Sequence, residues 1–250
     1  MDSAEYKAMF CMEENHWWYK GMRDLLFSTI ARNFKNNKKI RILDVGCGTG
    51  INLKYLSRLG SAYGIDISEE AINFCSQRTI RNALGGTAMQ IPFKEGSFDL
   101  VISTDVLCHN RVTCDVTALN EIYDVLKDGG IFIINLPAYG FIKRQHDIRV
   151  HTRHRYLRSE LRFLLEESKF KIIKISYRNL FLFFIFLLLK FKNNKITEES
   201  TSDLKPVNDF LNSFLYNILR IENFILRILD VPLGTSIFCV SVKLPNHKNV

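Results

Sequence analysis

Ile42-Leu43-Asp44-Val45-Gly46-Cys47-Gly48-Thr49-Gly50 is the stretch that decides the fold of this 250-residue chain. Its apolar first half is typical of a buried strand, and that strand runs directly into three glycines at alternate positions. Glycine tolerates positive φ and lets a ligand approach the backbone, and the helix expected over 51–58 offers unpaired N–H groups to that ligand. The stretch therefore predicts a nucleotide-binding turn between a strand and a helix.

The spacing of the glycines narrows the choice of nucleotide. A dinucleotide fingerprint requires G-x-G-x-x-G, whereas this chain reads G-x-G-x-G after Asp44 and has Ile51 where the third glycine would stand. The turn also lacks the G-K-[ST] ending of a P-loop, so no lysine is placed to bind a nucleoside triphosphate. The next expected strand ends in Asp66, whose carboxylate is placed to bind both hydroxyls of a ribose.

Five blocks in this order resemble a known family, the class I S-adenosylmethionine-dependent methyltransferases, and within it the small-molecule type often called type 11. They spell LDVGCGTG at 43–50, YGIDIS at 63–68, IPF at 91–93, SFDLV at 97–101 and VLKDGG at 125–130. The resemblance covers roughly residues 40–178 and the last strand. It implies S-adenosylmethionine as cofactor and an α/β, Rossmann-like fold with a seven-stranded, mostly parallel sheet, helices on both faces and an antiparallel last strand.

From residue 40 onward the chain itself alternates between strand-like and helix-like segments. Such alternation indicates parallel strands covered by helices, with the ligand at the carboxyl ends of the strands. We expect strands at 40–45, 62–66, 84–88, 98–103, 130–136, 171–177 and 235–242, and helices at 51–59, 69–82, 115–126 and 159–167. We divide the chain into an N-terminal helical lid at 1–38, a methyltransferase core at 39–178 and 233–245, and an apolar helical insertion at 179–232.

The donor site that the resemblance implies draws on four of these segments. The glycine turn would take the methionine part of the donor, Asp66 its ribose, and the apolar side chains of Ile67 and Met89 its adenine. The family commonly has an acidic residue after the glycine of the third strand, where this chain has Thr87. The expected cofactor-binding residues are Asp44, Gly46, Cys47, Gly48, Gly50, Asp66, Ile67, Thr87, Ala88, Met89 and Thr104.

Two histidines, His109 and His151, are the candidates for accepting a proton from the acceptor. Relatives place a histidine where His109 stands, close to the transferred methyl, although a histidine among apolar residues often serves only as a structural hydrogen bonder. The segment lacks the (Asp/Asn)-Pro-Pro-Tyr motif with which class I enzymes hold a planar amine or amide. We therefore expect methylation of oxygen or carbon, for which the enzyme mainly aligns the reactants and excludes water.

The acceptor side is predicted from a basic span and an aromatic cluster. The net charge of +8 favours an anionic partner, and seven Lys or Arg and three His lie within 143–162, although a solvated basic surface would look the same. Arginine binds carboxylate or phosphate bidentately. In many type 11 relatives a His-Trp-Trp-Tyr stretch like the one at 16–19 resembles a lid. The expected substrate-binding residues are His16, Trp17, Trp18, Tyr19, His146, Arg153, Arg155 and Tyr156.

The insertion is the least conventional part of the chain. Residues 180–189 are ten consecutive apolar residues, and as a helix they would span about 15 Å, half of the roughly 30 Å needed to cross a bilayer. Apolar residues then recur at helical spacing over 207–229. Two interpretations of the insertion stay open. The helices pack on each other as a lid or form a homodimer seam through 206–229, or they serve peripheral membrane contact through 180–192 or an apolar substrate channel.

These observations predict an S-adenosylmethionine-dependent methyltransferase acting on a small or lipid-linked, anionic acceptor. The six cysteines form no C-x-x-C pair, so we expect neither a structural metal nor an iron–sulfur cluster. The acidic first 15 residues do not resemble a secretory signal, so we expect a cytoplasmic protein, at the inner face of the membrane if the insertion binds lipid. Two alternatives stay open: an RNA methyltransferase that uses the basic span, and a non-catalytic donor-binding scaffold at membranes.

Overall fold

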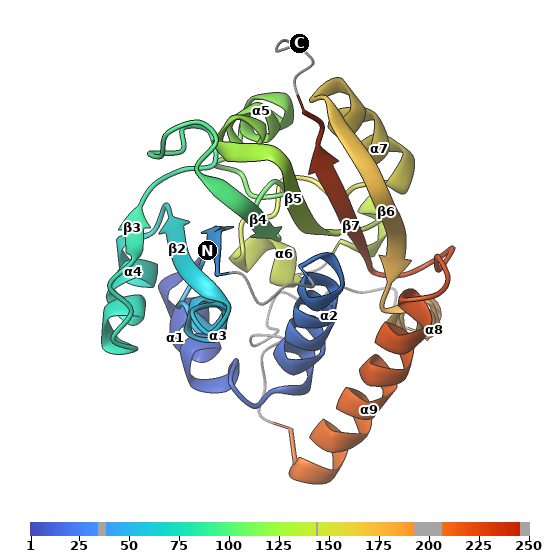
Figure 1. Cartoon of the computed structure of the whole chain (residues 1–250). Helices are drawn as coiled ribbons and strands as arrows, with labels where there is room; N and C mark the ends of the chain where they lie inside the picture. The colour runs from blue at the N-terminus through green and yellow to red at the C-terminus, as the bar shows by residue number, and fades with distance from the viewer. Residues whose placement is uncertain (35–38, 144, 193–206, 246–250) are drawn as a thin grey trace.

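The computed structural model describes residues 1–34, 39–143, 145–192 and 207–245, and its centre is a seven-stranded sheet (Figure 1). The strand order is β3-β2-β1-β4-β5-β7-β6. All neighbouring strands pair in parallel except β7, which is antiparallel to both β5 and β6. The predicted class I fold with an antiparallel last strand is therefore confirmed. The strands are β1 (Ile40–Val45), β2 (Gly60–Asp66), β3 (Ala83–Gly85), β4 (Phe98–Thr104), β5 (Leu126–Pro137), β6 (Phe170–Arg178) and β7 (Ser236–Lys243).

Successive residues of β1 face opposite sides of the sheet, which explains why the strand carries apolar residues on both faces around Arg41 and Asp44. Leu43 and Val45 belong to one buried cluster, together with residues of α5 (Asp115–Val125) and α7 (Arg158–Glu167). Ile40 and Ile42 belong to a second cluster on the other face, with residues of α2 (Trp17–Asn33) and α3 (Ile51–Leu56). The sheet is thus covered by helices on both faces, as the sequence predicts.

Helices differ from the sequence expectations at three places, the first being α3, which ends at Leu56 and not at 59. The helix α4 (Glu69–Gln77) ends five residues before the predicted 82, because Thr79 adopts a left-handed conformation with φ +61°. The short helix α6 (Gln145–Arg149) lies in the basic span, and a single 3₁₀ turn, η1 (Gly140–Ile142), lies just before it; no helix is predicted at either place. The chain opens with α1 (Ser3–Met12), which packs against α4.

The insertion between β6 and β7 forms two helices, α8 (Leu180–Lys192) and α9 (Asp209–Leu226). In Figure 1, α9 runs alongside α2 below the sheet. The helices approach closely at Gly21, where an added Cβ would lie 2.5 Å from Cδ1 of Leu219. Within the described ranges, no helix combines the length and the apolar character needed to cross a membrane.

Candidate functional site

The glycine turn brings the end of β1 beside the end of β2. The N–H groups of Gly46 and Cys47 donate to the carbonyl of Ile65 at 2.8 and 3.0 Å. The three glycines of the turn have φ values of +74°, +54° and +86°, which favour glycine over other residues. A Cβ on Gly46 would also lie 2.2 Å from Cγ2 of Val106. The turn is therefore restricted to glycine by both backbone conformation and space.

Asp66 stands at the edge of this turn, where the prediction placed it. Its Oδ2 accepts a hydrogen bond from the N–H of Gly48 at 2.9 Å, and its Oδ1 accepts one from the N–H of Ser68 at 3.0 Å. Burial raises the pKa of Asp66, and these two N–H groups oppose the rise. The carboxylate is held in a fixed orientation with room for further donors on its lone pairs.

Asp44 lies beneath the turn and is only 1% exposed. Neither of its carboxylate oxygens has a hydrogen-bond partner of normal geometry among the described residues, although Asn52 is near enough to lower its pKa slightly. Burial outweighs this effect and raises the pKa of Asp44 to about 7. An orphaned buried carboxylate fits a ligand that carries positive charge.

S-adenosylmethionine matches both features of the turn. It carries an ammonium and a sulfonium cation, which suit the unpartnered carboxylate of Asp44, and a ribose whose hydroxyls suit Asp66. The remaining predicted cofactor residues border the same strand ends. The N–H of Gly86 donates to the carbonyl of Asp66 at 3.0 Å, which joins the Thr87–Ala88–Met89 turn to β2, and Thr104 ends β4. Ile67 is 51% exposed beside them, and Cys47 is buried against Gly64.

The first helix, α1, covers the glycine turn. The hydroxyl of Tyr6 donates to Oδ1 of Asp66 at 3.4 Å, and a Cβ on Gly48 would lie 2.8 Å from Cε of Met9. Just past the helix, Glu13 binds the hydroxyl of Thr49 and forms an ion pair of 2.7 Å with Arg78. Tyr6 thus occupies part of the carboxylate expected to bind the ribose, so its hydroxyl competes with the ribose for Oδ1 of Asp66.

The two candidate proton acceptors come together in the folded chain. The ring centroids of His109 and His151 are 5.7 Å apart. The amino group of Met1 contacts Nε2 of His109 at 3.3 Å and Nδ1 of His151 at 3.2 Å, and Asp2 contacts the other nitrogen of His151 at 2.9 Å. Burial, helped by nearby positive groups, lowers the pKa of His109 to about 4. His109 is therefore neutral at physiological pH, as a proton acceptor must be.

The aromatic cluster divides between two neighbours. The N–H of Trp17 donates to Oδ1 of Asn212 in α9 at 2.8 Å, whereas the ring of Trp18 lies 5.9 Å from Cζ of Arg178 at the end of β6. His16 is buried at the start of α2, and its Nδ1 lacks a partner in the described structure. Burial raises the pKa of Tyr19, with Glu13, Glu5 and Asp105 adding to the effect.

The predicted anion-binding side chains of the basic span are engaged by the protein itself. Arg153 forms an ion pair with Asp115, and Arg155 binds Asp147 through Nε and Nη2, both at 3.0 Å. The hydroxyl of Tyr156 donates to the carbonyl of Leu107 at 3.1 Å and to Asp115 at 3.0 Å. His146 belongs to α6, and its Nδ1 is buried without a partner among the described residues.

This arrangement differs from the expectation that the span offers free cations to an acceptor. The reason is that Asp115 and Asp147, both largely buried, need positive partners, and the arginines that follow along the span supply them. The first pair ties the span to α5, and the second joins two parts of the span to each other. An acceptor-binding role for Arg153, Arg155 and Tyr156 stays a prediction that would require these contacts to open.

Sequence reasoning missed two contributors to this region. Tyr6 carries no motif, and only the packing of α1 places its hydroxyl on Asp66. Arg178 ends β6 and is buried among Trp18, Met22 and Asn135. The available signal for Arg178 was a charged residue at the carboxyl end of a sheet strand, the edge at which ligands of such folds bind.

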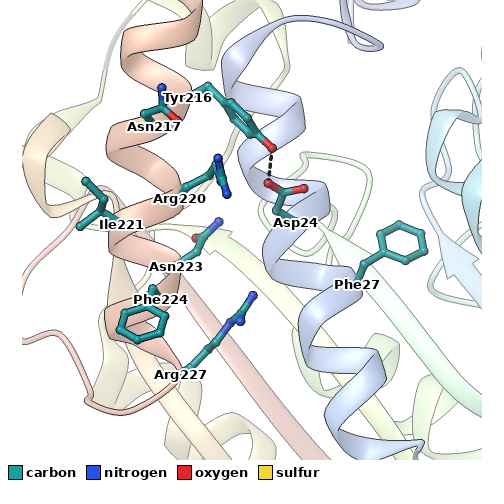
Figure 2. Close-up of a pocket in the computed structure, with 9 residues that line it drawn as sticks. All are labelled: Asp24, Phe27, Tyr216, Asn217, Arg220, Ile221, Asn223, Phe224 and Arg227. Carbon is teal, nitrogen blue, oxygen red and sulfur yellow. Dashed lines mark hydrogen bonds between the residues drawn. The ribbon is translucent and has the colours of Figure 1, made fainter.

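A separate groove lies between α2 and α9, away from the glycine turn (Figure 2). It has a volume of about 800 Å³, and one side is closed by a hydrogen bond of 2.5 Å from the hydroxyl of Tyr216 to Asp24. It contains none of the predicted site residues. Its lining is Asp24, Phe27, Tyr216, Asn217, Arg220, Ile221, Asn223, Phe224 and Arg227.

Comparison with known proteins agrees with the geometry. The type 11 family model described as "Methyltransferase domain" matches residues 43–134. The 18S rRNA (guanine-N(7))-methyltransferase of Bos taurus is 35% identical over 112 residues, which are 40% of this chain and 40% of that protein. The fatty-acid O-methyltransferase of Mycolicibacterium smegmatis is 36% identical over 117 residues, 44% of this chain and 40% of that protein. The chain thus spans about two fifths of the length of these curated relatives.

A solved structure shows the same fold over most of the chain. Phosphoethanolamine N-methyltransferase 2 of Haemonchus contortus, in complex with S-adenosyl-L-methionine, is 19% identical with a TM-score of 0.56, over 88% of this chain and 52% of that one. The matched family segment contains the turn of Gly46–Gly50 and the carboxylate of Asp66. Both lie at the strand ends of the seven-stranded sheet described above. Residues 43–134 therefore match the methyltransferase domain of type 11, and the chain has the class I fold of S-adenosylmethionine-dependent methyltransferases.

Proposed function

We propose that this protein transfers a methyl group from S-adenosylmethionine to an oxygen or carbon atom of a small or lipid-linked acceptor that carries an anionic group. One observation supports the proposal above all: Asp66 is fixed by the N–H groups of Gly48 and Ser68 at the edge of a turn with three glycines of positive φ, and the unpartnered Asp44 lies just before that turn. These groups together form a polar site that suits a nucleoside with a positive charge.

The chain's own residues have distinct roles in this proposal. Asp66 binds the ribose hydroxyls, and the turn with Asp44 holds the methionine part. When bound, S-adenosylmethionine supplies an already activated methyl group, so the protein mainly aligns the acceptor and excludes water. His109, neutral because burial lowers its pKa to about 4, or the adjacent His151 takes the proton of a hydroxyl acceptor, whereas a carboxylate acceptor has no proton to lose.

Calorimetric titration with S-adenosylmethionine and its demethylated product tests the donor part. We expect saturable binding to the native protein and loss of binding in Asp66→Ala. The matched control is Asp128→Asn, which removes an exposed carboxylate far from the turn and should leave the affinity unchanged. A native protein that binds neither compound refutes the proposal.

The acceptor class is proposed from charge and apolar surface together. The relative that acts on fatty acids offers a precedent for an acceptor with an apolar chain and a carboxylate. Mass spectrometry of cell lipids and glycan precursors, with and without the gene, should reveal a species that gains one CH₂ only when the gene is present. An unchanged profile in both extracts, with donor affinity intact, favours the non-catalytic scaffold.

RNA is the second candidate acceptor, because one relative methylates 18S rRNA. The ion pairs of Arg153 and Arg155 with Asp115 and Asp147 weigh against it, since they leave less positive charge for a phosphate backbone. Binding of arbitrary RNA with a steep dependence on salt concentration would favour RNA. We expect weak binding with a shallow salt dependence.

We further propose that the insertion makes the contacts of the protein with its surroundings. Apolar side chains are exposed on both of its helices, among them Phe181, Phe184 and Leu188 on α8 and Phe210, Phe214 and Ile221 on α9. The proposed contacts are with the inner face of the membrane through 180–192 and with a second copy through 206–229. Liposome flotation and light scattering distinguish them, since only the first requires lipid.

A further inference from the structure

Arg178 is a buried cation whose hydrogen bonding is incomplete. The residue ends β6 and is 1% exposed. Its Nη1 donates to Oδ1 of Asn135 at 3.3 Å and contacts Sδ of Met22. Its Nε and Nη2 are buried and have no hydrogen-bond partner in the described part of the chain. Buried donors left without partners are costly, so such a group signals a missing oxygen.

The unpartnered atoms form one specific edge of the guanidinium. Nε–H and one N–H of Nη2 point in parallel, in the geometry that binds two oxygens of a carboxylate or phosphate. The same chain shows this edge in use elsewhere, because Arg155 binds Oδ1 and Oδ2 of Asp147 through Nε and Nη2, each at 3.0 Å. The Nε–Nη2 edge of Arg178 is thus unoccupied, whereas the same edge of Arg155 is occupied by the carboxylate of Asp147.

The protein's own carboxylates do not fill that edge. Glu222 and Asp105 lie within electrostatic range of Arg178. However, Glu222 accepts from the backbone N–H groups of Asn179 and Leu180, and Asp105 accepts from Nδ2 of Asn135 at 3.1 Å. Each carboxylate thus has one oxygen engaged elsewhere, and neither is hydrogen-bonded to Nε or Nη2 of Arg178. An external oxyanion would meet these unused donors.

The position of Arg178 links this edge to the reaction site. Its partner Asn135 binds Asp105, which is followed by Val106, the residue packed against Gly46 of the donor turn. On its other side, the guanidinium is covered by the thioether of Met22 and the partly exposed ring of Trp18, both on α2. A ligand here has its charged end inside and apolar side chains around it.

We propose that the Nε–Nη2 edge of Arg178 binds the carboxylate or phosphate group of the acceptor, beneath Trp18 and Met22 of α2. The inference rests on the proposed methyl transfer for the identity of the ligand as acceptor, but the anion site itself is a separate property. It assigns the anion-binding role to Arg178, in place of the paired Arg153 and Arg155 of the basic span. The covering side chains must shift to admit the ligand.

Tryptophan fluorescence provides a direct test, because the protein has two tryptophans and Trp18 lies against Arg178. In the Trp17→Phe variant, all tryptophan fluorescence comes from Trp18. The probes are octanoate, octyl phosphate, the neutral octanol and the cationic octylamine, each below its micelle concentration. We expect a saturable change in emission with octanoate or octyl phosphate and none with octanol or octylamine. The probe that binds more tightly tells a carboxylate acceptor from a phosphorylated one.

Variants then assign the effect to one side chain. Arg178→Met should weaken the binding of the anionic probe at least tenfold, and Arg178→Lys should restore part of it. The matched control is Arg162→Met, which removes an exposed arginine of α7 and should bind as the native protein does. An equal response to octanol and octanoate, or unchanged binding in Arg178→Met, overturns the proposal.

Two further measurements keep the outcomes separable. If Arg178→Met does not fold, the comparison of anionic and neutral probes in the Trp17→Phe protein decides alone. Titration with S-adenosylmethionine is run in parallel, and Arg178→Met should retain donor affinity. A protein that binds the donor but no anionic probe refutes the Arg178 site only, whereas one that binds the probe but no donor refutes the proposed function only.

Discussion

Replacing Asp44 with asparagine should change how the stability of the protein depends on pH. Burial raises the pKa of this carboxyl from 3.8 to about 7. In the unfolded chain the group would titrate at about 3.9. Between these values the folded protein retains a proton that the unfolded chain has lost, so folding becomes less favourable as pH rises from about 4 to about 7 and then levels off.

The magnitude follows from the size of the shift. About three pKa units at 1.36 kcal/mol each give a destabilisation of up to about 4 kcal/mol above pH 7. Asp44→Asn keeps the shape of the side chain and removes the titration. The variant should therefore gain stability over the native protein with rising pH, by about 1.4 kcal/mol per pH unit between pH 4 and 7. The gain should come with weaker donor binding, because the carboxylate is expected to face the donor's positive charge.

Urea unfolding followed by circular dichroism at pH 5, 6, 7 and 8 measures this difference. The quantity to compare is the free energy of unfolding of the variant minus that of the native protein, since other titrating groups cancel in it. A difference that stays constant across the series would show that Asp44 titrates normally. The buried-carboxylate reasoning, and with it the case for a cation above Asp44, would then be wrong.

Three further predictions concern the same site. Tyr6→Phe removes the hydroxyl that contacts Asp66, so the affinity for S-adenosylmethionine measured by calorimetry should rise about two- to tenfold; weaker binding would mean that Tyr6 assists the donor. Gly46→Ala should lower the stability in thermal unfolding by at least about 1 kcal/mol and abolish binding of S-adenosylmethionine. The control is Gly129→Ala, where φ is a similar +75° but no atom lies within 4 Å of the new Cβ. This variant should lose stability only and bind S-adenosylmethionine normally. Because burial lowers the pKa of His109 to about 4, the methyl-transfer rate should be level from pH 6 to 8 and should fall only below about 5 if His109 accepts the proton. A fall centred near pH 6.5 would mean that a group with an ordinary histidine pKa accepts it.

The sheet and the donor turn could be predicted because their signals are local. The apolar run of β1, the three glycines and the carboxylate at the end of β2 each follow from neighbouring residues, and the parallel order follows from the alternation of strands and helices. The end of α4 was misjudged because a single left-handed residue, Thr79, is hard to foresee without a glycine or proline to mark it.

The acceptor side could not be predicted in the same way. An arginine looks the same in a sequence whether it is paired or free, and only the fold brings Asp115 to Arg153 from a distant helix. Conversely, Arg178 ends an ordinary alternating strand, and its unpartnered edge becomes visible only once Asn135, Met22 and Trp18 surround it. Charge pairing and burial are tertiary properties, so local pattern does not determine them.

The contact between α2 and α9 has a mechanical consequence. Asn223 donates to the carbonyl of Gly21 at 2.8 Å, Tyr216 to Asp24 at 2.5 Å, and the N–H of Trp17 to Asn212 at 2.8 Å, so three bonds along their length tie the two helices together. The helix that covers Arg178, α2, is thereby bound to a helix with six exposed large apolar side chains, Phe210, Leu211, Phe214, Ile221, Phe224 and Ile225. If a bilayer or a second copy binds α9, a movement of α9 would therefore be transmitted through α2 to the acceptor site proposed at Arg178.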